Sequence, residues 1–63
     1  MKYVIGYYPK WAQGSIRFIR VYKNGKTFVE RMHGKTATQF TTTEEALTAA
    51  TKFQIPNPII HSL

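Results

Sequence analysis

Arginine and aromatic side chains alternate within residues 15–23, in a pattern that suits contact with a nucleic acid. Phe18, Arg20 and Tyr22 occupy every second position. Successive side chains of a β-strand point to opposite faces, so these three residues share one face of a predicted strand. Guanidinium groups bind phosphates and guanine edges, and flat rings stack on bases or pack against sugars. The chemistry that this pattern indicates is binding to a polyanion.

A predicted β-hairpin positions this pattern. Two strand-like stretches, residues 15–23 and 26–32, flank the tetrapeptide Lys23-Asn24-Gly25-Lys26. Asn-Gly is the strongest short hairpin signal, because both central residues of a type I′ turn need a positive φ. Such a turn also fixes the register of the strands. The predicted pairs are Val21–Phe28, Ile19–Glu30, Arg17–Met32 and Lys23–Lys26 on one face, and Tyr22–Thr27, Arg20–Val29, Phe18–Arg31 and Ile16–His33 on the other.

The first of these faces is predicted to pack on the core. Val21, Phe28, Ile19 and Met32 form a contiguous apolar patch there. Arg17 and Glu30 are diagonal neighbours on the same face, so we expect them to pair. The second face collects arginines and rings, and we expect it to be exposed. The predicted nucleic-acid-binding residues, which include the cationic hairpin tip, are Arg17, Phe18, Arg20, Tyr22, Lys23, Lys26 and Arg31.

Two alternatives for this surface stay open from the sequence. If the two faces are exchanged, Arg17 and the tip lysines Lys23 and Lys26 become the contact group. In a competing interpretation, Phe18 and Ile16 pack under the C-terminal tail, and the arginines are only solvated.

The charge of the chain is unevenly distributed. Nine Lys and Arg residues face three Glu residues in 63 positions, for a net charge of +6. Residues 1–35 hold eight of the basic groups and one Glu, whereas residues 36–63 hold Lys52 against Glu44 and Glu45. A basic half beside a near-neutral half favours a polyanionic partner. The alternative is solubility, since a net charge of about 2–8 is ordinary for a small domain.

A loop after the first predicted strand offers a possible anchor for a partner. Pro9 ends the strand predicted over residues 2–8, because proline cannot donate to a ladder. Lys10 and Trp11 follow it. A loop Trp beside a cation is typical of an interface anchor. In a domain this small, Trp11 is equally expected to cap one end of the core.

A helix is predicted over residues 43–53. Thr42 and Glu45 fit a capping box, in which the hydroxyl accepts an orphan N–H and the carboxylate reaches back. The apolar stripe of this helix is Ala46, Ala49, Ala50 and Phe53, with Leu47 beside it. Pro56 and Pro58 forbid continuation, so residues 54–63 are predicted to be an extended tail.

These elements predict one α+β domain over residues 1–63. Three strands, at about 2–8, 15–23 and 26–32, form an antiparallel sheet in the order β-β-β-α, because each connection is too short for a crossover. The C-terminal helix packs on one face, since it has one apolar stripe to bury. A short edge strand near Phe40 is an additional possibility.

Several classes of function lack the residues that they need. His33 and His61 are the only imidazole bases, and the chain has no Asp or Cys to orient or assist either. We therefore expect no enzyme, no metal site and no cofactor. No stretch approaches the roughly 20 apolar residues of a membrane span. Without a signal peptide or cysteines, we expect a complete, soluble, cytoplasmic chain.

The layout of residues 5–53 resembles plant ethylene-response (APETALA-type) DNA-binding domains and the arm-site-binding domains of phage integrases. The matching stretches are Tyr7-Tyr8-Pro9-Lys10-Trp11, Ser15-Ile16-Arg17-Phe18-Ile19-Arg20 before Lys23-Asn24-Gly25-Lys26, and Phe40-Thr41-Thr42-Thr43-Glu44-Glu45-Ala46. The resemblance implies a three-stranded sheet with a helix behind it, and a sheet that enters the major groove. It carries the groove-contacting role to Arg17, Arg20 and Arg31. The chain departs from the family in lacking its second-strand Trp, with Phe18 nearest, and in the longer connector from His33 to Gln39.

Two functions therefore stay open. The first is binding of nucleic acid, with duplex DNA expected, through the exposed sheet face. The second is a small phage-type inhibitor or adaptor that binds an acidic surface of a host protein. A monomer or a homodimer fits either function, and two copies would pair if strand 2–8 or the segment near Phe40 were an open edge.

Overall fold

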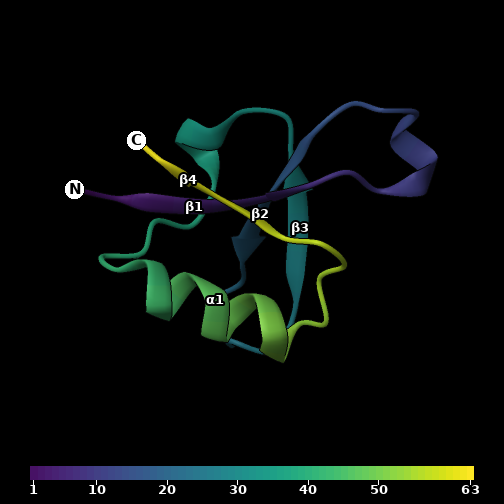
Figure 1. The fold of residues 1–63 in the computed structure, drawn as a ribbon. Helices are drawn as coiled ribbons and strands as arrows, with labels where there is room; N and C mark the ends of the chain where they lie inside the picture. Colours follow the sequence, from purple (N-terminus) through teal and green to yellow (C-terminus); the bar gives the residue numbers. More distant parts are fainter.

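The computed structural model describes residues 1–63 as a four-stranded antiparallel sheet with one helix against one face (Figure 1). The strand order across the sheet is β3-β2-β1-β4. The α+β class and the antiparallel sheet are confirmed. In chain order the elements are β1 (Tyr3–Tyr7), the 3₁₀ turn η1 (Lys10–Ala12), β2 (Arg17–Val21), β3 (Phe28–Arg31), the 3₁₀ turn η2 (Gly34–Thr36), α1 (Thr43–Lys52) and β4 (Ile59–Ser62).

The fourth strand corrects the predicted fold. The tail is extended as predicted, but β4 joins the sheet along β1, from Gly6↔Ile59 to Tyr3↔Ser62. The sheet therefore has four strands, and α1 lies between β3 and β4 rather than at the C-terminus. The β-branched pair Ile59-Ile60 favours a strand, and Pro58 lies just before it, where it interrupts no ladder. Strand β1 is thus internal and offers no open edge.

The hairpin has the predicted register but a different turn. Phe18↔Arg31 and Val21↔Phe28 bound the paired stretch. Of the two central residues only Gly25 has a positive φ, 69°, so the turn is not type I′. The Gly25 N–H donates to the Tyr22 carbonyl at 2.9 Å, in a four-residue loop from Lys23 to Lys26. This loop has one more residue on each side than the predicted two-residue turn. Because the two additions are equal, the pairing of the strands is unchanged.

The core lies between α1 and one face of the sheet, here called the helix face. Its buried residues come from β1, β2, α1 and the turn before β4: Ile5, Tyr7, Ile19, Ala46, Ala50 and Ile55. The rings of Phe28 and Phe53 pack edge to face at 5.4 Å. The face predicted to be the core face is therefore confirmed for Ile19, Val21 and Phe28. The prediction is wrong for Met32, which lies just beyond the end of β3 and is 68% exposed. We call the opposite side of the sheet the outer face.

The start of α1 confirms half of the predicted capping box. The Thr42 hydroxyl accepts the Glu45 N–H at 3.1 Å. The Glu45 carboxylate does not reach back to the backbone but accepts the Thr41 hydroxyl at 2.5 Å. The helix ends at Lys52, and Phe53 is its C-cap.

The connector from β3 to α1 fills a gap between β1 and β2, which pair only at Gly6↔Phe18 and Tyr7↔Arg17. Beyond these pairs, the Thr38 N–H donates to the Ile19 carbonyl at 3.0 Å. Phe40 and Tyr3 exchange both backbone hydrogen bonds at 2.8 Å. The strand expected near Phe40 is thus an isolated bridge inside the sheet and not an edge.

Candidate nucleic-acid interface

The outer face of β2 and β3 carries an exposed cationic and aromatic surface. Arg20 and Arg31 are exposed, and Tyr22 is 51% exposed. The register pairs Arg20 with half-buried Val29 and Arg31 with Phe18, so the two arginines are diagonal neighbours on adjacent strands. The structure therefore brings together three of the predicted contact residues, and we call Arg20, Tyr22 and Arg31 the hairpin surface.

A backbone contact restrains one of these arginines. Arg20 Nη1 donates to the Thr36 carbonyl of η2 at 3.1 Å. A guanidinium has five N–H donors, so this bond leaves others free for a ligand. Lys35, next to Thr36, is exposed and adds a cation that the sequence analysis did not assign to the site. The contact between Arg20 and η2 depends on how η2 folds back, which no local pattern indicates.

Side chains from β4, together with Gly34 of the turn η2, cover the other half of the outer face. Phe18 packs edge to face on His61, with ring centroids 5.5 Å apart. A Cβ on Gly6 would lie 2.9 Å from Ile16 Cδ1 and 3.3 Å from His61, so only glycine leaves room for this packing. Phe18 and Ile16 therefore pack against the C-terminal strand, as the competing interpretation held. We call Val4, Gly6, Ile16, Phe18 and His61 the covered half.

Arg17 lies apart from the hairpin surface. Its register partner Tyr7 belongs to the core, which places Arg17 on the helix face. Its guanidinium lies 5.1 Å from the centre of the Trp11 ring and donates to the Ile16 carbonyl at 3.1 Å. The predicted pair with Glu30 is therefore wrong.

Glu30 instead accepts the Tyr7 hydroxyl at 2.9 Å. Tyr7 is a core residue of β1, and its hydroxyl reaches across β2 to β3. Burial raises the pKa of Tyr7 to about 12, and the hydrogen bond and the charge of Glu30 contribute to the shift. The carboxylate nearest to the hairpin surface in the sequence is thus held on the helix face.

The remaining cations of the hairpin lie at its tip. Lys23 and Lys26 are exposed in the loop between β2 and β3. Lys52 Nζ donates to the Gly25 carbonyl at 2.8 Å, which ties the tip to the end of α1. The tip therefore extends the cationic surface beyond the strands from a restrained loop.

No Asp or Glu side chain shares the outer face with these cations. The chain has three carboxylate side chains, Glu30, Glu44 and Glu45. Glu30 points to the helix face, and the other two lie in the first turn of α1. Because α1 packs on the helix face, all three carboxylates lie on that side of the sheet. The uneven charge along the sequence thus becomes an uneven charge between two faces.

The predicted partner anchor is exposed. Trp11 in η1 is 62% exposed, so it does not cap the core, and Ala12 is the buried residue of that turn. Lys10 is also exposed, and Tyr8 before it is 55% exposed. Arg17 and the exposed Trp11 ring form a cation–π pair, which a partner could contact at this end of the sheet.

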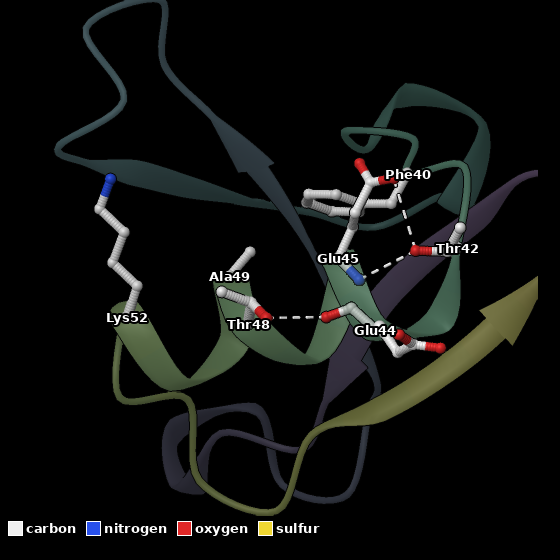
Figure 2. A pocket seen from close by; sticks show the side chains of 7 residues that line it. All are labelled: Phe40, Thr42, Glu44, Glu45, Thr48, Ala49 and Lys52. Atoms are coloured by element: carbon white, nitrogen blue, oxygen red, sulfur yellow. Dashed lines mark hydrogen bonds between the residues drawn. The ribbon is translucent and has the colours of Figure 1, made fainter.

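A shallow groove of about 490 Å³ runs along α1 on the side of Phe40 (Figure 2). Figure 2 shows Phe40 and Glu45 at one end of the groove and Lys52 at the other. Its remaining lining is Thr42, Glu44, Thr48 and Ala49. Two carboxylates make this groove a poor site for a polyanion.

The surface geometry described above is the basis for a functional proposal, since no known relative adds to it. No three His, Asp or Glu side chains converge as a metal site would need. The single helix is neither long nor apolar enough to cross a membrane. Comparison of the chain with protein-family models, with curated proteins and with solved structures gave no match.

Proposed function

We propose that this chain is a small, non-catalytic nucleic-acid-binding module that contacts duplex DNA through the outer face of β2 and β3. The observation that supports this most is the exposure of Arg20 and Arg31 on a face without acidic side chains. The exposed part of this face attracts phosphates, because no acidic side chain there opposes them. Lys23 and Lys26 extend the same charge to the tip.

Duplex DNA fits this surface better than a single strand. Proteins that hold single strands stack successive bases on several exposed rings. Here Phe18 packs on His61, and Tyr22 is the one exposed ring of the hairpin surface. A two-stranded ribbon fits a major groove about 12 Å wide, where arginines reach phosphates and guanine edges. The resemblance to ethylene-response and integrase arm-site domains implies the same mode.

Fluorescence anisotropy with a labelled mixed-sequence duplex tests the proposal. We expect affinity to fall steeply between about 50 and 200 mM salt, because bound cations release counterions. Arg20→Ala combined with Arg31→Ala should weaken binding by about 30-fold, the loss of two charge-assisted contacts.

A matched variant controls for bulk charge. Lys2→Ala combined with Lys10→Ala removes the same charge from the residue before β1 and from η1, both outside the hairpin surface and its tip. We expect it to weaken binding only two- to threefold, about 0.5 kcal/mol. Equal losses in the two double variants, or affinity that ignores salt, would contradict the proposal.

A second candidate function is binding to an acidic surface of another protein, as a small inhibitor would. The exposed Trp11, stacked with Arg17 and flanked by Lys10, supports it, because Trp, Tyr and Arg dominate interface energies. Affinity capture from a lysate with and without nuclease separates the two functions. Loss of all partners after nuclease favours nucleic acid, and one stoichiometric protein that Trp11→Ala releases favours the inhibitor.

A further inference from the structure

The sheet has two outer edges, and they differ in charge. β3 carries Glu30 and Arg31, and Lys26 lies in the loop just before it. β4 is Ile-Ile-His-Ser, and residues 53–63 contain no Lys, Arg, Asp or Glu. Charged side chains normally protect a sheet edge against pairing with another chain. That protection is present at β3 and absent at β4.

The register of β4 shows which of its backbone groups are free. The Leu63 N–H donates to the Lys2 carbonyl at 2.8 Å. In an antiparallel ladder the bonding direction alternates, so Ile59 and His61 also bond inward to β1. The N–H and C=O groups of Ile60 and Ser62 therefore point away from the sheet. They are two donors and two acceptors without a partner in the ladder.

This set of free groups is complementary to itself. In an antiparallel pair of β4 strands, Ile60 of each copy faces Ser62 of the other, and four hydrogen bonds form about a two-fold axis. Pro58, which lacks an N–H, limits pairing before the strand. An edge with this symmetry suits a second copy of the same chain.

Apolar side chains flank the same edge. Phe53 packs against Phe28 of the hairpin, so the other flank of α1, which carries Leu47, lies towards β4. Leu47 is 48% exposed, and Ile60 of β4 is half-buried on the same side of the sheet, since it pairs with the core residue Ile5. Two copies joined at β4 would bring these side chains together across the axis and remove them from water.

We propose that this chain forms a homodimer through antiparallel pairing of β4 with β4 of a second copy. The joined sheet has the order β3-β2-β1-β4 in each half. The cationic hairpins then lie at its two far ends, where repulsion between two chains of charge +6 is weakest. An extended segment of another protein would meet the same free groups but not the two-fold symmetry of the Leu47 contacts.

Sedimentation equilibrium of nucleic-acid-free protein tests the dimer from about 10 µM to 1 mM. We expect the mass to rise towards about 14.6 kDa, twice the chain mass of 7.3 kDa. Higher salt should strengthen the dimer, because it screens the repulsion between the copies, whereas the same salt weakens DNA binding. A mass of one chain throughout this range, in low and high salt, would overturn the proposal.

Two pairs of variants locate the interface. Ser62→Pro removes an outward N–H and should weaken the dimer at least about tenfold, since two bonds are lost per dimer. Met32→Pro is its control beyond β3, at a residue that is also at an edge and 68% exposed. Leu47→Lys places two cations across the axis and should also dissociate the dimer, while Thr48→Lys on the groove side should not. Dissociation by the two control variants alone would overturn β4 as the interface.

Failure of this proposal and failure of the proposed function give different results. Arg20→Ala combined with Arg31→Ala should abolish most DNA binding and leave the dimer intact, because the hairpin is far from β4 in the sheet order. A dimer that dissociates in this variant would overturn the β4 interface, even if DNA binding behaves as expected.

Discussion

The two halves of the outer face differ although they belong to one continuous surface of the sheet. In the covered half, His61 packs on Phe18, and Val4 is fully buried. On the hairpin surface, Arg20 and Arg31 are exposed. The border falls within strand β2, between Phe18 and Arg20. One alternating pattern of arginines and rings therefore has two outcomes along β2. At its start the ring of Phe18 is packed, and at its end the cation of Arg20 is exposed.

The cause of this division is the reach of the C-terminal strand. β4 pairs with β1, so its side chains cover β1 and the first residues of β2 but not β3. In a chain of 63 residues, helix α1 covers only one face, and β4 supplies part of a cover for the other. What stays uncovered is the outer face of the hairpin, and that is where the cations gather.

The largest effect is expected from Phe18→Ala, which removes the ring at the border of the covered half. Because Phe18 is half-buried against His61, the free energy of unfolding should fall by about 2 kcal/mol. Urea unfolding measures this, and duplex affinity of the folded fraction should stay within twofold. A stable variant with much weaker DNA binding would place Phe18 on the binding surface instead.

A smaller effect is expected from Tyr7→Phe, a substitution on the helix face of the sheet. The variant leaves Glu30 without the hydroxyl that it accepts and should cost about 1 kcal/mol near neutral pH. Duplex affinity should not change, since Glu30 faces away from the hairpin surface.

The effect of Tyr7 on stability also depends on pH. Folding raises the pKa of Tyr7 to about 12, so the folded state holds the phenolic proton more tightly than the unfolded state does. This stabilisation is complete below the unfolded pKa of about 10 and is lost as pH rises towards 12. Unfolding curves at about pH 9 and pH 11 should show wild type losing more stability than Tyr7→Phe. Equal losses would contradict the raised pKa of Tyr7 in the folded state.

The smallest effect is expected from Tyr22→Ala on the hairpin surface. Its ring is exposed, so the free energy of unfolding should change by less than about 0.5 kcal/mol. Affinity for a duplex should fall two- to fivefold, about 0.4–1 kcal/mol. A loss well above tenfold with a single strand, but not with a duplex, would indicate base stacking on Tyr22 and a single-stranded ligand.

Local patterns predicted the parts of the fold that depend on neighbours in the sequence. The hairpin register and the core face follow from the alternation in β2 and β3, and the helix follows from Thr42 and the alanine stripe. The turn type was wrong, because Gly25 alone adopts a positive φ and a longer loop preserves the same pairing.

The parts that could not be predicted depend on residues far apart in the chain. Val4 pairs with His61, and no local signal indicates that partner. The β-branched residues after Pro58 could have been recognised as a strand, but not its place beside β1. The packing of Phe18 under the tail was one of two alternatives from the sequence, and only the place of β4 decides between them. The contact from Arg20 to η2 does not follow from the sequence at all.

An NMR titration of the ¹⁵N-labelled chain with a mixed-sequence duplex tests the division of the outer face most directly. At low salt, we expect amide shifts at Arg20, Tyr22, Arg31 and the hairpin tip, with Val4 and His61 unchanged. At high salt, the same shifts should require far more DNA. Shifts confined to α1 or β4, or shifts that do not depend on salt, would contradict the hairpin surface as the site of binding.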